Sequence, residues 1–396
     1  MSSSFQDGQN PYDFDHRYHG PFYTPDHQAW RSTLRAFVDK EIIPFVDEWD
    51  EAGEFPRELY KKAAEVGLLG IGYPEIYGGT PVPDPFFLLV TAEEMARSSS
   101  GGVNASLLVH SIGLPPVLNI GSDEMKNRIA PQVLAGEKIH ALAITEPSGG
   151  SDVANLQTRA KLDGDHYVVN GSKMFITGGM RADYYTVAVR TGGDGAGGVS
   201  LLLIERDREG FTRTSLKKQG WWASDTAALY FDDVRVPKEN LIGTENTGFI
   251  GIMMNFNNER LGMSASANAL ARVCLEDAIA WARDRKTFKK RLADHQVIRH
   301  KFAEMARKIN ATQAYLEQCA LRVQAGENPI SDLSLLKVQA TLTMEYCARE
   351  AMQILGGAGY MRGCRVERIY REVRVMAIGG GSEEIMRDLA ARQMDI

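Results

Sequence analysis

The spacing of apolar residues changes twice along this chain, and this double change restricts the possible folds more than any other feature. Over 24–136 apolar residues recur at helical steps, as Leu34 and Val38 do. Over 139–243 the period falls to two, which is typical of strands. After Gly248 the helical period returns and persists to the end. The chain is therefore predicted to contain a helical segment, a β segment and a second helical segment, in that order.

The central segment is expected to form short strands joined by tight turns. Its β-branched and aromatic residues alternate over 159–169 and continue over 168–176. Asp163-Gly164 and Asn170-Gly171 lie within these stretches, and both dipeptides favour tight turns because they tolerate positive φ. Further strands are expected over 184–190, 199–205 and 227–236. A β-sandwich or barrel fits this pattern.

The last segment is expected to form a four-helix bundle. The pattern predicts one long helix over 249–285, a second that Asp294 caps, and a third between Pro329 and Gly356. A final helix begins near Ser382, whose side chain suits an N-cap. The predicted domains are an N-terminal helical domain over 1–137, a central β domain over 138–246 and a C-terminal bundle over 247–396. The first 20 or so residues are polar and are expected to be loosely ordered.

Composition excludes several classes of protein. The 396 residues are 44% apolar and 24% charged, as in a folded chain of several domains. A net charge of −6 argues against binding of nucleic acid or anionic lipid. The apolar runs are far shorter than the ~20 residues of a membrane helix, and the N-terminal sequence does not resemble a signal peptide. We therefore expect a cytoplasmic protein without membrane insertion.

The common catalytic and metal-binding motifs do not indicate a function for this sequence. Residues 193–198 match GxGxxG, but they lie between two expected strands and not between a strand and a helix, so a hairpin loop is the better interpretation. The sequence contains no Walker A loop, HExxH or GxSxG. The four cysteines form no CxxC pair, and the histidines have no ligand spacing beyond the weak pair His295 and His300. No metal site is therefore expected, and the cysteines are interpreted as packing residues.

Four motifs, taken in order, resemble those of the acyl-CoA dehydrogenase family. They are TEPSGGSD at 145–152, GDHYVVNGSKMFITGG at 164–179, RKTF at 285–288 and QILGGAG at 353–359. The resemblance extends from about residue 30 to the end of the chain. It implies N-terminal helices, a central β domain and a C-terminal four-helix bundle, with FAD as cofactor and a homotetramer as the assembly.

The resemblance also implies which residues hold FAD. Ile144 and Thr145 match contacts to the pyrimidine edge of the flavin, and Ser151 matches a contact to the cofactor or to the substrate phosphates. A second group matches contacts that a neighbouring subunit supplies, and the start of the last helix adds two more cofactor residues. In sequence order, the remaining cofactor residues are Phe175, Ile176, Thr177, Arg285, Phe288, Gln296, Gln353, Gly357, Ser382 and Glu384. Phe175 replaces the tryptophan that is usual in the family, and Lys289 replaces a glycine.

The catalytic base is expected at Glu259. Most of the family carries a glutamate at the position that is Gly380 here, whereas isovaleryl-CoA and long-chain acyl-CoA dehydrogenases supply the base from a Glu-Arg pair on the first long C-terminal helix, which Glu259-Arg260 resembles. Glu259 falls on a largely apolar helical stripe, where poor solvation would raise its pKa towards that of a useful base. The resemblance implies that Gly380 keeps a role through its backbone N–H, which with a ribityl hydroxyl of FAD would donate to the thioester oxygen. Arg260 is expected either to fix the helix that carries the base or to bind near the substrate.

These assignments predict oxidation of an acyl-CoA thioester to trans-2-enoyl-CoA, with electrons passed to an electron-transfer flavoprotein. Two alternatives stay open. One is an acyl-CoA oxidase or flavin monooxygenase of the same fold, and the other is a flavin-bearing binding protein without turnover. The length and branching of the acyl chain are not predicted.

Overall fold

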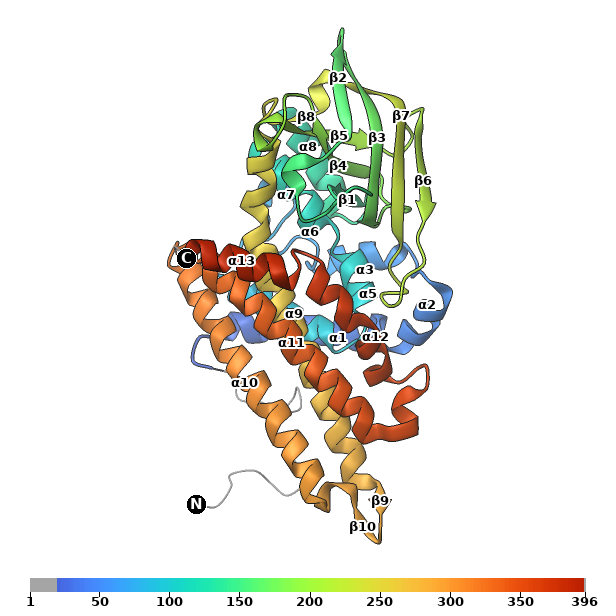
Figure 1. Cartoon of the computed structure of the whole chain (residues 1–396), viewed down its shortest axis with the longest axis vertical. Coiled ribbons are helices and arrows are strands. Elements are labelled where there is room, and N and C mark those ends of the chain that lie inside the picture. The colour runs from blue at the N-terminus through green and yellow to red at the C-terminus, as the bar shows by residue number, and fades with distance from the viewer. Residues whose placement is uncertain (1–19, 395–396) are drawn as a thin grey trace. The chain divides into compact units, whose positions relative to one another are not determined.

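The computed structural model describes residues 20–394, except for the side chains of 254–258, so the predicted loose N-terminal segment lies outside the described residues. The predicted order of helical, β and helical segments is confirmed (Figure 1). The first segment contains α1 (Pro25–Glu41), α2 (Val46–Ala52), α3 (Glu58–Glu65), α4 (Phe86–Ala96), α5 (Gly101–Leu107), α6 (His110–Gly113), α7 (Pro115–Ile120) and α8 (Asp123–Leu134).

The strands follow, and the second helical segment comes after them. The strands are β1 (His140–Ala143), β2 (Arg159–Asp163), β3 (His166–Thr177), β4 (Tyr184–Arg190), β5 (Val199–Glu205), β6 (Phe211–Ser215), β7 (Thr226–Pro237) and β8 (Leu241–Ile242). The last segment contains α9 (Gly248–Asp284), the short strands β9 (Lys286–Thr287) and β10 (Lys290–Arg291), α10 (Gln296–Gln324), α11 (Ile330–Leu355), α12 (Arg365–Ile378) and α13 (Glu383–Gln393). Helix α12 was not among the predicted helices.

The chain divides into two compact units. The sheet unit comprises Glu48–Pro83 and Gly102–Glu259. The helical unit comprises Met1–Asp47, Asp84–Gly101 and Arg260–Ile396. Helices α1 and α4 therefore belong with the C-terminal helices, whereas α3 and α5 to α8 belong with the strands.

The sheet unit is built on one eight-stranded sheet. Seven strands follow the order β6-β7-β3-β2-β4-β5-β8, and β1 pairs with β4 in parallel. Gly164, at φ +64°, lies in the β2–β3 hairpin, as predicted. The turn expected at Asn170-Gly171 is wrong, because β3 continues through it with only a register shift. Gly171, at φ +143°, is needed because a Cβ there would lie 2.7 Å from the Cα of Thr158.

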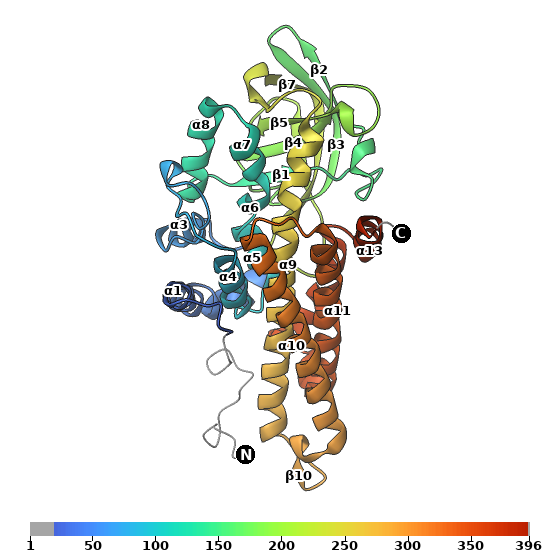
Figure 2. The same ribbon diagram turned by 90° about the vertical axis from the view of Figure 1, so that its left-hand side faces the viewer.

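Helices α7 and α8 lie along one side of this sheet (Figure 2), and their apolar side chains pack against it. Val117 of α7 and Ile129 and Val133 of α8 pack in one cluster with Leu201 and Leu203 of β5, and all five are buried. Burial of this kind contributes roughly 1.5–3 kcal/mol for each large aliphatic side chain. The cluster also contains Ile144, so it supports the loop that follows β1.

The helical unit has its own apolar core and its own caps. The core contains Leu89 of α4, Leu261 of α9, Leu316 of α10 and Leu336 of α11. Ser382 caps α13, as predicted, because its hydroxyl accepts a hydrogen bond from the N–H of Ile385. The predicted cap at Asp294 is wrong: α10 starts at Gln296 after His295, and the Asp294 carboxylate instead pairs with Arg291.

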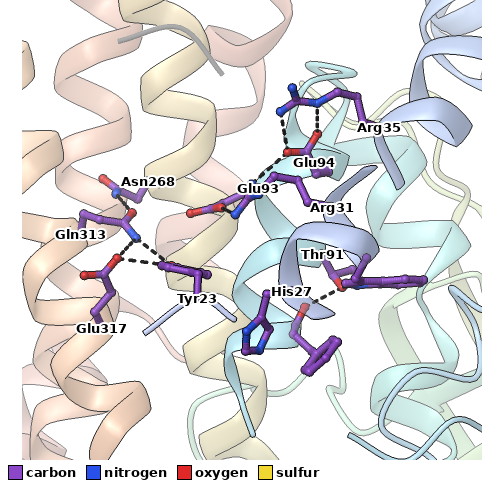
Figure 3. A network of polar contacts seen from close by, with 12 residues as sticks. Tyr23, His27, Arg31, Arg35, Thr91, Glu93, Glu94, Asn268, Gln313 and Glu317 are labelled. Atoms are coloured by element: carbon purple, nitrogen blue, oxygen red, sulfur yellow. Dashed lines mark hydrogen bonds and ion pairs between the residues drawn. The ribbon is translucent and has the colours of Figure 1, made fainter. Parts of the chain in front are cut away.

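A buried charge network joins α1 to α4 within the helical unit (Figure 3). Arg31 donates to Glu93 and to Glu94, each at 2.9 Å, and Arg35 donates to Glu94 at 3.0 Å. Arg31, Glu93 and Glu94 are no more than 5% exposed. Charges removed from water in this way are tolerated only because each has a partner.

Replacing Arg31 with methionine should destabilise the helical unit by about 3–5 kcal/mol, because two buried carboxylates lose a cation. Guanidinium unfolding followed by circular dichroism would measure the change in the free energy of unfolding. Arg307→Met is the matched control, since Arg307 pairs with Glu304 on the exposed surface of α10 and should matter little. A loss in Arg31→Met no larger than that of the control would contradict the prediction.

Three of the four cysteines are packing residues, as predicted. Cys274, Cys319 and Cys347 are free and buried, and Cys364 is half-buried at the start of α12. Burial raises the pKa of the Cys319 thiol to about 12 and raises the pKa of Cys274 and Cys347 as well. These three thiols therefore stay protonated at neutral pH, which makes them poor nucleophiles.

Within residues 20–394, no single helix has both the length and the apolar character needed to cross a membrane. By length and composition alone, one bent pair, Gly101–Leu107 with His110–Ile120, passes the same test.

Candidate active site

The loop after β1 carries the first predicted cofactor residues. Ile144 is buried, at 9% exposure, and Thr145 follows it. The backbone N–H of Met174 donates to the carbonyl of Thr145 at 2.8 Å, and Nζ of Lys173 donates to the carbonyl of Ile144 at 2.9 Å. The structure therefore brings residues 144–145 beside the 173–177 stretch of β3. Ser151, further along the same loop, is exposed.

A buried ion pair that the sequence reasoning missed fixes this loop. Lys173 and Glu146 are 0% and 4% exposed, and their Nζ and Oε1 atoms lie 2.8 Å apart. Glu146 also accepts hydrogen bonds from the backbone N–H groups of Gln157 and Thr158. Burial lowers the pKa of Lys173 to about 8, against the opposing effect of Glu146. Burial raises the pKa of Glu146, but Lys173 and the N–H donors outweigh it and hold that pKa below its usual value.

Phe175 stands out from the sheet on a strained backbone. Its φ is +61°, at the register shift between Lys173 and Ile176, and its side chain is 67% exposed. Ile176 is buried, and Thr177 pairs with Thr226 of β7. A left-handed phenylalanine costs roughly 1–3 kcal/mol, and such strain is found mainly at functional sites. The kink leaves an aromatic face available to a ligand.

The hairpin between β9 and β10 carries the RKTF motif in the helical unit. Phe288 and Lys289 are its two central residues, with φ of +50° and +67° as in a type I′ turn. The turn therefore keeps its left-handed shape although Lys289 replaces the usual glycine. The Phe288 side chain is 92% exposed, and Arg285 just before the hairpin is exposed too. Gln296 is the first residue of α10 and is also exposed.

Two more predicted cofactor residues lie where α11 ends. Gln353 is in its last turn, Gly357 follows it, and both are exposed. A Cβ built on Gly357 would meet no atom within 4 Å, so the backbone there is open to close approach by a ligand.

The connection between α12 and α13 carries the third predicted group. Gly380 lies in it at φ +67°, Ser382 caps α13, and Glu384 lies in the first turn. The N–H of Glu384 itself and the Ser382 hydroxyl hold the pKa of the Glu384 carboxyl below its usual value. Position 380 offers a backbone N–H and no carboxylate.

Glu259 and Arg260 lie side by side in α9. Glu259 is half-buried and Arg260 is 7% exposed. Ile252, two turns earlier on the predicted apolar stripe, is 1% exposed, and Met263 is half-buried. The side chain of Phe256, another residue of the stripe, lies outside the described part of the chain.

These residues fit the chemistry of FAD. A flavin is a flat aromatic ring, and each unit presents one exposed aromatic ring on left-handed backbone: Phe175 in the sheet unit and Phe288 in the helical unit. A diphosphate needs charge-assisted donors, and Arg285 presents an exposed guanidinium. Gly357 adds backbone with no side chain in the way.

Comparison with known proteins identifies the chain. Family models for the acyl-CoA dehydrogenase N-terminal, middle and C-terminal domains match residues 24–137, 141–234 and 246–394. An acyl-CoA dehydrogenase from Alternaria alternata is 39% identical, with 94% of this chain and 92% of that protein covered. The mitochondrial long-chain specific acyl-CoA dehydrogenase of Rattus norvegicus is 37% identical, with coverage of 94% and 87%.

Solved structures agree. A crystal structure from Mycobacterium smegmatis, described as a putative acyl-CoA dehydrogenase, is 47% identical with a TM-score of 0.92, covering 94% of this chain and 98% of the other. A glutaryl-CoA dehydrogenase from the same organism, solved in complex with FADH2, is 28% identical with a TM-score of 0.89, and coverage is 94% and 95%. A chain described under the electron transferring flavoprotein of Acidaminococcus fermentans is 32% identical with a TM-score of 0.90, and coverage is 95% and 99%.

The fold and the matched domains define an oxidoreductase with a helical, a sheet and a second helical domain. The chain belongs to the acyl-CoA dehydrogenase family, which is FAD-dependent and whose general reaction is dehydrogenation of acyl-CoA.

Proposed function

We propose that this enzyme removes the α-proton and the β-hydride of an acyl-CoA thioester to give trans-2-enoyl-CoA, with Glu259 as the base. The assignment of the base rests on the residues found at positions 380 and 259. Position 380 is a glycine with φ of +67°, whereas α9 offers the half-buried carboxylate of Glu259. A general base must be a carboxylate at one of these two positions if this chain follows its family, and only Glu259 has one.

In this reaction each side chain has a defined task. The Glu259 carboxylate takes the α-proton, and the electron pair of the broken C–H bond becomes the new Cα=Cβ bond. The N–H of Gly380 donates to the thioester oxygen, where negative charge develops. FAD, when bound, supplies the two-electron acceptor for the hydride that leaves Cβ. Arg260 and Ser151 contribute to binding of the substrate.

The same proposal assigns the cofactor contacts. Ile144 and Thr145 hold the pyrimidine edge of the flavin. From a neighbouring subunit, Arg285 pairs with the diphosphate, and Gln353 and Gly357 complete the site. The other members of the cofactor set are Ser151, Phe175, Ile176, Thr177, Phe288, Gln296, Ser382 and Glu384. A homotetramer is the assembly that would supply the second group, and multi-angle light scattering of the purified protein would measure it.

Anaerobic titration of the flavin with straight and branched acyl-CoAs tests the function and its substrate. Bleaching of the flavin absorbance by at least one of these thioesters is the expected result, with the preferred chain giving the fastest phase. Loss of bleaching across the whole panel, with FAD bound, would favour a binding protein without turnover.

The electron acceptor separates the dehydrogenase from an oxidase or monooxygenase of the same fold. We expect the substrate-reduced enzyme to react slowly with air and quickly with an electron-transfer flavoprotein. Stopped-flow reoxidation with each acceptor measures the two rates. Rapid reoxidation by oxygen would overturn the proposed acceptor and favour the oxidase.

A further inference from the structure

A buried lysine contacts the glycine loop, which is the segment 379–381 between α12 and α13. Lys337 belongs to α11 and has no exposed surface, with Leu333 and Leu336 equally buried beside it. Its ammonium donates to the carbonyl of Ala377 at 3.3 Å and also to the carbonyl of Gly381. The Lys337 side chain is therefore hydrogen-bonded to the backbone on both sides of Gly380.

The loop needs such a support because its residues have little conformational preference of their own. Gly380 and Gly381 have φ values of +67° and +108°, and glycine loses more conformational entropy on ordering than any other residue. Helix α12 ends at Ile378, and the cap of α13 begins at Ser382. The segment between these helices is therefore held by their ends and by the lysine.

Burying the ammonium group of Lys337 costs free energy, so its presence in α11 calls for an explanation. An ammonium group buried among leucines is unfavourable unless it is hydrogen-bonded, and here it is hydrogen-bonded to backbone carbonyls. An apolar side chain of similar length would avoid this cost if α11 needed only packing.

We propose that Lys337 is a positioning residue that fixes the Gly380 N–H as a donor to the thioester oxygen. This assignment rests on the proposed function, in which that N–H stabilises the charge formed when the α-proton leaves. A hydrogen-bond donor accelerates the reaction only when it is already in place. An enzyme with a mobile glycine loop would therefore still bind the substrate, but it would remove the α-proton slowly.

The test separates proton removal from hydride transfer. In a 3-thia-acyl-CoA, sulfur replaces the β-carbon, so no hydride can leave and only the α-proton is exchangeable. The holoenzyme is incubated with this analogue in D2O, and mass spectrometry follows deuterium at the α-carbon. Calorimetry gives the dissociation constant of the analogue, and thermal unfolding reports on the fold.

Lys337→Met should slow this exchange by about 10- to 100-fold while the dissociation constant changes less than threefold. Ser334→Ala is the matched control: Ser334 is buried one turn earlier on α11, its hydroxyl bonds only to its own helix at Ile330 in the described contacts, and exchange should stay at the wild-type rate. If Lys337→Met does not fold, Lys337→Gln, which keeps a shorter N–H donor, should give the same loss.

Two results would overturn the assignment. One is exchange at the wild-type rate in the folded Lys337 variant, and the other is a loss of exchange matched by an equal loss of affinity, which would indicate a merely structural role. A wild-type enzyme that binds the analogue without exchange would instead overturn the proposed function, and this assignment with it.

Discussion

Glu259→Gln should bind FAD and acyl-CoA yet reduce the rate of anaerobic flavin bleaching at least about a thousandfold, since general bases contribute up to ~10⁴-fold. The amide has nearly the shape of the carboxylate but cannot take the α-proton. Stopped-flow mixing with the preferred thioester measures the rate, and flavin absorbance together with calorimetry verifies that both ligands still bind.

Glu276→Gln is the matched control for this experiment. Glu276 is also a half-buried glutamate of α9, and it lies 3.5 Å from Arg365 in the helical unit. Its replacement should leave bleaching close to the wild-type rate. Near-normal bleaching in Glu259→Gln would remove Glu259 from the mechanism and require another base.

Acid should destabilise the sheet unit through two buried histidines. His110 and His140 are 4% and 0% exposed. Burial lowers the pKa of His110 to about 4, and burial with the nearby His110 lowers the pKa of His140 to about 3. In the unfolded chain both would titrate near 6.5. Between these values the unfolded state binds more protons, so stability falls as the pH is lowered through 6.5 towards 4.

For His140, the hydrogen bonds show what a second proton on the buried ring would meet. Thr186 donates its hydroxyl to the carbonyl of Gly113, so the same oxygen must accept from Nε2–H of His140 at 2.8 Å. The Nδ1 of His140 is then a bare, buried nitrogen with no partner among the described residues. Protonation would place a charged donor there without an acceptor. His110 differs: its Nε2–H donates to the carbonyl of Leu69 at 2.9 Å, which raises its pKa, but burial outweighs this effect.

Each histidine should lower the free energy of unfolding by about 2 kcal/mol between pH 7 and pH 5. Guanidinium titrations at the two pH values measure the difference, and His140→Gln should remove about half of the histidine contribution. His300→Gln, at an exposed position near the start of α10, should leave the pH dependence unchanged. An undiminished pH dependence in His140→Gln would contradict the argument.

Local patterns predicted most of the elements, and the errors have physical causes. The hairpin at Asp163-Gly164 could be predicted because turn chemistry acts within a few residues. Asn170-Gly171 has the same chemistry, but the glycine is required by contact with Thr158, a neighbour that no local pattern identifies. Helix α12 could have been found, since Val366, Ile369 and Val373 recur at helical steps and are buried.

Two buried lysines, Lys173 and Lys337, were missed for a different reason. Lys173 interrupts a strand and Lys337 interrupts the apolar stripe of α11, so each was visible as a charge where an apolar residue was expected. Their hydrogen-bond acceptors include backbone carbonyls, which every residue has, at distant points of the chain. A sequence can reveal a charged residue where an apolar one is expected, but only the fold identifies the groups to which it is hydrogen-bonded.

The backbone of the glycine loop also determines how the base could move in evolution or design. A side chain at position 380 would have to adopt φ of +67°, and one at position 381 would have to adopt φ of +108°, both in the region that favours glycine. A single substitution therefore cannot carry the carboxylate from α9 to this loop without strain. In this chain, a carboxylate placed at position 380 should therefore change the path of the main chain as well as the residue.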